Sequence, residues 1–366
     1  MKIFSSPVVL FLIAFSMMGC KGNYDEKSFN GDIVYIQNDV PEDKAIGVPV
    51  ELKALYLGSA ITVQDSILVC WTPKDPNVFF HVYNLKTGEL CGKFCHKGRG
   101  PEETVATAPI FQIYKENGAM KALVNFHNER KIMHWNITES IRQQRSVFEG
   151  MTPRYDKSVK YKEIFWLNPG EVIGYVSSEP LTFVHDSATL PYLIKCAAKT
   201  GKPVVSYDLF AGTLEWERKR EQSPLPDDYY YSMNCISPDR SKIAMGMAML
   251  AQINVLDLET GRQTGYRLKG MPGFEIFRKN LDDAKVYFTQ VQADDSHIYA
   301  LYSDKKYGSG WGAQDLLYIF NWNGELVRKV RLANGVKYIS VGNPGILYTL
   351  DDNEEYVYKY NLFPFI

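Results

Sequence analysis

The sequence shows no excess of either charge and, after its first twenty residues, no long hydrophobic run. It contains 41 Lys and Arg residues against 42 Asp and Glu residues. Nucleic-acid binding generally needs a basic patch, which this balance does not favour. A membrane-spanning helix needs about 20 apolar residues, and no segment after Cys20 meets that requirement. The composition therefore predicts neither a nucleic-acid partner nor a protein that crosses the membrane repeatedly.

The common signatures of metal and nucleotide chemistry are also missing. The chain contains no HExxH, no GxSxG, no P-loop and no EF-hand spacing. No two of the six histidines have a spacing that requires a metal. We expect no metal and no cofactor, and the catalytic residues of any activity stay unknown. A metal site assembled from distant segments remains the open alternative.

Cysteine is scarce, and its spacing argues against disulfides. Five cysteines follow Cys20, so at least one is unpaired within the chain. Cys91 and Cys95 are four residues apart, and on a strand they would point to the same face about 13 Å apart, beyond disulfide reach. We expect buried free thiols.

The one long apolar run lies at the N-terminus and predicts export. Lys2 precedes the run Val8–Met18, and Gly19 follows it. A short basic region, an apolar stretch of about 7–15 residues and a small residue before the cut form a secretory signal. Met17–Cys20 resembles a lipobox, so residues 1–19 are expected to be a signal peptide and Cys20 the lipid-bearing residue. An ordinary signal peptide with an incidental cysteine is the alternative.

The polar residues that follow predict a lipidated tether over 20–30, joined to a domain over 31–366. The tether has no acidic residue at positions 21–23. Lipoproteins exported to the cell surface often carry acidic residues directly after the cysteine. We therefore expect an outer-membrane lipoprotein of the cell envelope that faces the periplasm rather than the cell surface.

Short strand-like runs separated by turn signals recur along the rest of the chain. Aromatic and β-branched residues, which favour strands, are frequent. Four hairpins share a turn that contains a glycine, at Gly88, Gly201, Gly261 and Gly324. The last three lie 60 and 63 residues apart, and about two such units separate the first two. This spacing predicts four-stranded propeller blades.

Counting these units predicts an all-β fold, a six-bladed β-propeller of four-stranded antiparallel blades. The pattern predicts Ile61–Cys70 as one strand and Lys131–Ile137 as part of the hairpin of the second unit. The last unit lacks an obvious fourth strand, whereas Gly31–Gln37 is a strand without a blade. We predict that Gly31–Gln37 completes the final blade, so that an N-terminal strand closes the ring and removes its free edges. A pair of two-sheet sandwiches is the alternative.

The segment His96–Glu103 carries a resemblance to a known family. Its sequence, HKGRGPEE, is similar to a loop of the TolB-like six-bladed β-propeller lipoproteins found mainly in Bacteroides-type bacteria. The lipobox, the chain length and the closing strand agree with that family over essentially the whole mature chain. The resemblance implies a fold and an envelope location. It implies no activity, substrate or catalytic residue.

The same loop is the first candidate for a binding site. Its glycines and proline bend the backbone tightly, and His96, Lys97 and Arg99 are suited to an anionic group that Glu102 helps to orient. A purely structural connector between blades is the alternative, since such connectors need tight turns in any propeller.

A second candidate loop surrounds Tyr307 and Trp311, which lie among three glycines. Aromatic faces on such a loop suit stacking on sugars or apolar groups. A flexible hairpin tip is the alternative. Separately, Ser66 and Ser187 each follow an aspartate and precede an apolar residue, a pattern that resembles the O-glycosylation acceptor of Bacteroides-type bacteria.

Two functions remain after these exclusions. The first is a membrane-anchored binding or scaffold module, a monomer whose propeller engages an envelope protein or a glycan. The second is a hydrolase or lyase that acts on a glycan or small ester in the central channel. Propellers host both kinds of function, so the fold cannot decide between them. Histidines and carboxylates clustered at the channel mouth would favour the enzyme, and a flat aromatic rim would favour binding.

Overall fold

The structure is a computed structural model that describes residues 28–53, 56–154, 159, 161–176, 190–211, 230–278, 284–307 and 312–366. The predicted signal peptide, Cys20, Ser187 and Trp311 lie outside these ranges. Within them, no helix has the length and apolar character that a membrane span requires.

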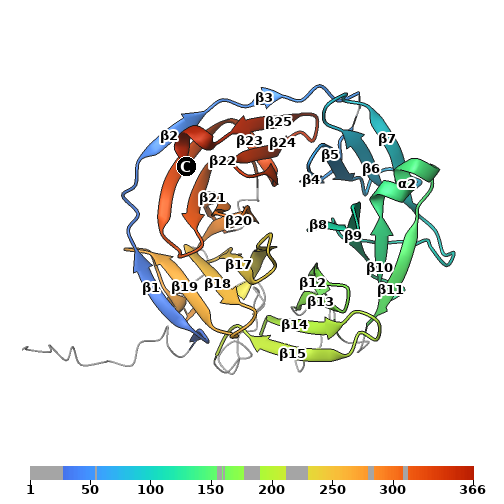
Figure 1. Cartoon of the computed structure of the whole chain (residues 1–366). Helices are drawn as coiled ribbons and strands as arrows, with labels where there is room; N and C mark the ends of the chain where they lie inside the picture. Colours follow the sequence, from blue (N-terminus) through green and yellow to red (C-terminus); the bar gives the residue numbers. More distant parts are fainter. Residues whose placement is uncertain are drawn as a thin grey trace, which may run out of the picture.

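In the described residues five hydrogen-bonded sheets surround a common axis (Figure 1), so the fold is an all-β propeller. The first sheet contains β4 (Ala60–Gln64), β5 (Ile67–Trp71), β6 (Val78–Asn84) and β7 (Leu90–His96). The second contains β8 (Ile113–Glu116), β9 (Ala119–Phe126), β10 (Lys131–Asn136) and β11 (Phe148–Pro153). The third contains β12 (Tyr161–Asn168), β13 (Glu171–Val176), β14 (Tyr192–Ala197) and β15 (Pro203–Asp208).

The last two sheets also take in strands from the N-terminal segment. The fourth contains β16 (Ser232–Ile236), β17 (Lys242–Met247), β18 (Gln252–Asp257), β19 (Gln263–Leu268) and β1 (Asp32–Ile36). The fifth contains β20 (Lys285–Ala293), β21 (His297–Lys306), β22 (Gln314–Asn321), β23 (Leu326–Asn343), β24 (Ile346–Asp351), β25 (Val357–Asn361) and β3 (Val48–Pro49), with β2 (Glu42–Ala45) paired to β23.

Burial falls from the inner strands to the outer ones because each sheet packs between two neighbours. In β6 every residue except the last is buried, so both faces of this strand contact other sheets. In β15, at the rim, five of six residues are exposed. The hairpin glycines at 88, 201, 261 and 324 all have positive φ, between 66° and 81°, as the turn prediction requires.

Two local predictions were wrong. Ile61–Cys70 is two strands rather than one, because Asp65 adopts a φ of 53° and turns the chain between β4 and β5. In the second sheet, Ile137 leaves the strand and begins a helix, α2 (Ile137–Gln143). Asn136 caps this helix by accepting a hydrogen bond from the Glu139 backbone N at 2.9 Å. The outer hairpin is therefore β10 and β11, connected through α2.

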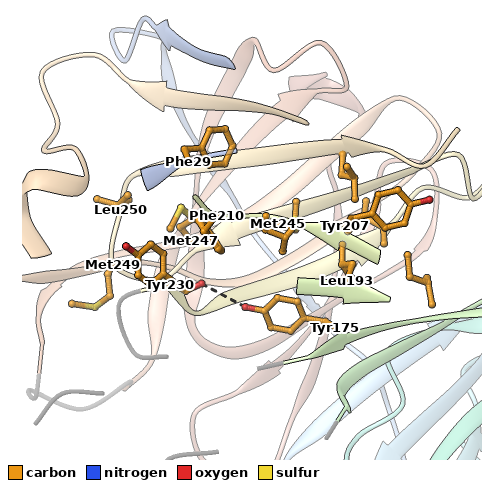
Figure 2. Packing of buried hydrophobic residues seen from close by; sticks show 14 of the residues in the cluster. Phe29, Tyr175, Leu193, Tyr207, Phe210, Tyr230, Met245, Met247, Met249 and Leu250 are labelled. Atoms are coloured by element: carbon orange, nitrogen blue, oxygen red, sulfur yellow. Dashed lines mark hydrogen bonds between the residues drawn. The ribbon is translucent and has the colours of Figure 1, made fainter. Parts of the chain in front are cut away.

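The N-terminal segment, residues 28–53, forms a strap along the outside of the sheets (Figure 1). Ser28 and Phe29 are buried, although the sequence analysis assigns them to the tether. Phe29 packs in the apolar cluster between the third and fourth sheets (Figure 2), with its ring 6.1 Å from that of Phe274. Phe274 belongs to the short 3-10 helix η2 (Phe274–Arg278), and a second one, η4 (Phe363–Phe365), follows β25. The packed part of the chain therefore includes residues 28–30.

The position of Phe29 also explains why the prediction for Gly31–Gln37 was wrong. Asn30 is held at the end of β15, where its side chain donates to the Asp208 carbonyl at 2.7 Å. The next residues therefore meet the nearest outer strand, and β1 pairs in parallel with β19. The strand that pairs with β25 in the last sheet is β3, in antiparallel orientation.

Glu354 joins the last sheet to the first. Its side chain is 8% exposed and accepts from Ser59 at 3.1 Å and from Lys74 at 3.3 Å, with a further ion pair to Lys337. Ser59 directly precedes β4 and Lys74 lies between β5 and β6 of the first sheet, whereas Lys337 lies in β23 of the last, so Glu354 bridges the two sheets. The contacts favour the ionised carboxylate, and they lower the pKa of Glu354 although burial alone would raise it.

Candidate functional site

Side chains near the axis link the innermost strands of successive sheets. Hydrogen bonds of this kind include Thr62 Oγ1 to the Ile110 carbonyl (2.7 Å), Val63 N to Ser340 Oγ (2.9 Å), Trp166 N to Gln112 Oε1 (2.7 Å) and Asn234 Nδ2 to Glu163 Oε2 (2.6 Å). Each bond satisfies a polar group that the packing of the sheets removes from water. The inner strands are thereby fixed relative to one another, which pre-forms any site between them.

A pocket of about 260 Å³ opens on the axis where these inner strands end. Its walls come from the ends of β4, β20 and β23, from β8 with the residues before it, and from the turn after β16. We call it the axial pocket; its polar side chains include Gln64, Gln112, Lys115, Arg240, Gln292 and Ser340. Within the described residues, its lining includes no histidine and no carboxylate.

Arg240 reaches the pocket from a tight turn between β16 and β17. Its φ is 63°, a left-handed value that is unusual for a residue with a side chain. Asp239 holds the turn by accepting from Ser237 Oγ at 2.5 Å and from the Ser241 backbone N at 3.0 Å. A strained backbone held by its neighbours is a feature of functional sites.

The guanidinium of Arg240 is positioned by the third sheet. It lies 4.2 Å from the ring centre of Trp166 and donates to the Leu167 carbonyl at 3.3 Å. Trp166 in turn stacks on Tyr114, with ring centres 4.3 Å apart and planes within 5°. Burial lowers the pKa of Arg240, because removal from water disfavours its charge.

The second cation of the pocket, Lys115, is already neutralised. Its ammonium lies 2.7 Å from Asp65 Oδ2, and this contact lowers the pKa of the Asp65 carboxyl. Among the described residues, no carboxylate forms an ion pair with Arg240. The pocket therefore presents one uncompensated positive charge.

Glu163 and Asn234 occupy the axis beyond the floor of the pocket. Glu163 is 4% exposed, and its two oxygens accept from the side chain and the backbone N of Asn234 at 2.6 and 3.3 Å. Burial raises the pKa of Glu163 to about 8. Burial raises the pKa of Tyr338, from the inner strand of the last sheet, and of Cys235, which lines the pocket, and an ionised Glu163 would raise both further. These groups are buried between the inner strands.

The predicted His96–Glu103 loop lies at the opposite end of the strands. It follows β7, and because neighbouring strands are antiparallel, the end of β7 lies where β4 begins. Lys97 is structural: it donates to the Pro73 carbonyl at 2.7 Å and lies over the Phe79 ring. His96, Arg99 and Glu102 are exposed on this loop.

The remaining predicted site residues are scattered. Tyr307 follows β21, so it lies at the same end as the His96 loop but on another sheet. Ser66 is half-buried in the turn between β4 and β5. The structure therefore does not gather these residues into one site. Sequence patterns do not single out Arg240, Gln292 and Glu163, since an arginine in a turn and an amide or carboxylate in a strand form no recognisable motif.

A larger groove lies at the rim between β15 and the strap. Its volume is about 570 Å³, and its lining includes Asn30, Asp32, Tyr207 and Arg262. Arg262 and Asp32 pair with each other at 2.9 Å and are both largely exposed. Because these exposed charges neutralise each other, the groove has less electrostatic attraction for a charged ligand than the axial pocket has.

The described residues contain no grouped metal ligands, and most of their thiols are buried. Where the structure describes the chain, no three His, Cys, Asp or Glu side chains are grouped as metal ligands. All five cysteines after Cys20 are free, and all except Cys91 are buried, which confirms the thiol prediction for four of them. Burial raises the pKa of Cys70, Cys95 and Cys235, which makes these thiols poor nucleophiles.

Comparison with known proteins gives the fold but no family. No family model matches the chain, and no curated protein matches it in sequence. The structure is similar to a member of the DUF4221 family from Bacteroides vulgatus, with 11% identity, 88% of this chain and 97% of the other covered, and a TM-score of 0.57. It is also similar to a candidate exported protein from Bacteroides fragilis, with 11% identity, coverage of 90% and 98%, and a TM-score of 0.54.

A lower-scoring match is the β-propeller domain of Cps50 (Swd1) from Myceliophteria thermophila, with 11% identity, coverage of 86% and 99%, and a TM-score of 0.44. At such low identity, the similarity to the two Bacteroides proteins establishes a shared fold and nothing about ligands.

Proposed function

We propose that this protein is an envelope-anchored binding module whose ligand enters the axial pocket. The observation that carries the proposal is the lining of that pocket. It combines amides, the hydroxyls of Thr62, Ser237 and Ser340, and the guanidinium of Arg240, which no described carboxylate neutralises, and the described part of the lining has no histidine or carboxylate. Such groups bind and orient a polar ligand. The hydroxyl and thiol side chains of the described lining have no histidine or carboxylate beside them in that lining to act as the general base that a hydrolase or lyase needs. The lining therefore favours binding over the alternative hydrolase or lyase.

The proposal includes a six-bladed ring. The long strand β23 pairs with β22 through its first half and with β24 through its second half. We therefore count the eight-stranded sheet as two blades, the second completed by β3, which closes the ring in place of Gly31–Gln37. The TolB-like assignment belongs to the same proposal and rests on the His96–Glu103 motif and this count.

The location is part of the proposal as well. It rests on the N-terminal sequence, with residues 1–19 as signal peptide and Cys20 as the lipid-bearing residue, and on the candidate exported protein of similar fold from B. fragilis. A monomer attached to the outer membrane and facing the periplasm would present its pocket to envelope glycans. Ser66 and Ser187 remain proposed glycosylation sites.

A pocket-filling variant tests the binding function. Gln292→Trp places a large ring in the axial pocket, and Asn323→Trp places the same ring on an exposed turn between β22 and β23. We expect at least one member of a panel of neutral and acidic mono- and disaccharides to raise the melting temperature of the wild-type protein and of Asn323→Trp, but not of Gln292→Trp. A panel without effect on the wild-type protein, or equal shifts in all three proteins, would contradict the proposal.

A further inference from the structure

Most N–H groups of the Arg240 guanidinium have no acceptor among the described residues. A guanidinium carries five N–H groups, and among the described residues that of Arg240 makes a single hydrogen bond, to the Leu167 carbonyl at 3.3 Å. The contact with the Trp166 ring positions the guanidinium but uses none of its N–H groups in a hydrogen bond. The remaining N–H groups point to a planar, two-oxygen acceptor, since a carboxylate matches the fork of a guanidinium.

The surrounding acids are already engaged. Asp65 pairs with Lys115 at 2.7 Å on the pocket wall. Glu116, whose charge also acts on Arg240, pairs with Lys121 at 2.7 Å. Among the described residues, neither acid is therefore available to neutralise Arg240. Partial burial also reduces the hydration that would otherwise stabilise its positive charge. An incoming anion would supply the missing charge.

The rest of the pocket suits hydroxyl groups. Among the described residues, the side chain of Gln292 makes no hydrogen bond, and that of Gln112 uses only its carbonyl oxygen, which accepts from Trp166 N. These amides offer both donors and acceptors to a ligand. The volume, about 260 Å³, is below the range of roughly 300–1,000 Å³ for drug-sized ligands. It exceeds what a bare carboxylate or phosphate fills, and it suits a single sugar ring.

We propose that the axial pocket binds one uronic acid unit, with the sugar carboxylate at Arg240 and its hydroxyls at Gln112 and Gln292. This inference rests on the proposed function of the pocket and adds the chemical class of its ligand. Arg240 supplies the recognition of charge, and the amides distinguish a sugar acid from a simple anion.

Calorimetric titration with D-glucuronate, D-glucose and inorganic phosphate tests the inference. We expect glucuronate to bind the wild-type protein at least ten-fold more tightly than either of the other probes. Arg240→Gln should weaken glucuronate binding at least ten-fold. Arg240→Lys keeps the positive charge but not the planar fork of N–H donors. Its affinity for glucuronate should lie between those of the wild-type protein and Arg240→Gln. Arg262→Gln, which removes an exposed cation outside the pocket, should bind as the wild-type protein does.

The outcomes separate this inference from the proposed function. Equal affinity for glucose and glucuronate would overturn the role of the carboxylate, and equal affinity for phosphate would overturn the role of the sugar. Failure of glucuronate to bind would overturn the inference as a whole. The binding function itself would still stand if another saccharide of the panel stabilised the wild-type protein and not Gln292→Trp. Unchanged melting temperatures of the Arg240 variants serve as the folding control.

Discussion

Burial near the propeller axis strongly changes the ionisation of one residue, Glu163. Its carboxyl lies between inner strands with almost no contact with water, and its pKa is raised to about 8 by burial. The hydrogen bonds from Asn234 favour the ionised form but do not offset the loss of hydration. At neutral pH the group therefore holds its proton, which makes it a neutral group between the inner strands.

This proton makes folding stability depend on pH. An unfolded chain would lose the Glu163 proton near the ordinary glutamate pKa, whereas the folded protein keeps it up to about pH 8. Between these values the folded state binds more protons, so stability falls as pH rises. At about 1.4 kcal/mol per pKa unit, Glu163→Gln should remove a penalty of about 3–5 kcal/mol at pH 9 and little at pH 5.

Urea unfolding of both proteins from pH 5 to pH 9 measures this difference. Glu259→Gln, at an exposed turn, is the matched control and should follow the wild-type curve. Parallel stability curves for Glu163→Gln and the wild-type protein would show that Glu163 is not protonated in the fold.

Single residues could be predicted as site candidates from the sequence only by their chemical type. Residues whose role depends on neighbours from other sheets could not be predicted in this way. Lys97 looks like an anion ligand in the HKGRGPEE segment, yet the structure uses it to hold the Pro73 carbonyl. Arg240 looks like an ordinary turn residue, and only the stacking on Trp166 from another sheet reveals its position. Contacts between residues more than 70 positions apart leave no local pattern.

Among the elements, the strap is the one whose partners could not be predicted. The hairpins with turns at Gly88, Gly201, Gly261 and Gly324 were predicted correctly because their period and turn chemistry are local. The pairing of the strap depends on where Phe29 is anchored, which only the assembled third and fourth sheets determine. Helix α2 was missed because a helix of seven residues inside a hairpin connection is too short to show a clear periodicity.

The anchoring of the strap predicts an effect on stability. Phe29 is 2% exposed, and a buried Phe→Ala substitution typically costs about 3–5 kcal/mol. We expect Phe29→Ala to lower the free energy of unfolding by about that amount in urea titrations. Val34→Ala, on an outward-facing position of β1 with 44% exposure, should change it by less than about 0.5 kcal/mol. Equal effects of the two substitutions would mean that the strap does not hold the sheets together.

For the whole molecule, the two ends of the strands differ in character. One end carries the His96–Glu103 loop, Tyr307 and the connections between sheets, which sequence reasoning favoured as sites. The other end carries short turns and the axial pocket, which depends on five inner strands brought together by the ring. Sequence patterns predicted the all-β fold and its repeat, but a site built from segments far apart in the chain becomes visible only in three dimensions.

The most direct test of this account is a crystal structure of the protein with the saccharide that stabilises it most. The account predicts ligand density in the axial pocket, in contact with Arg240 and Gln292. Density at the opposite end, against His96 or Tyr307, with an empty axial pocket would contradict it.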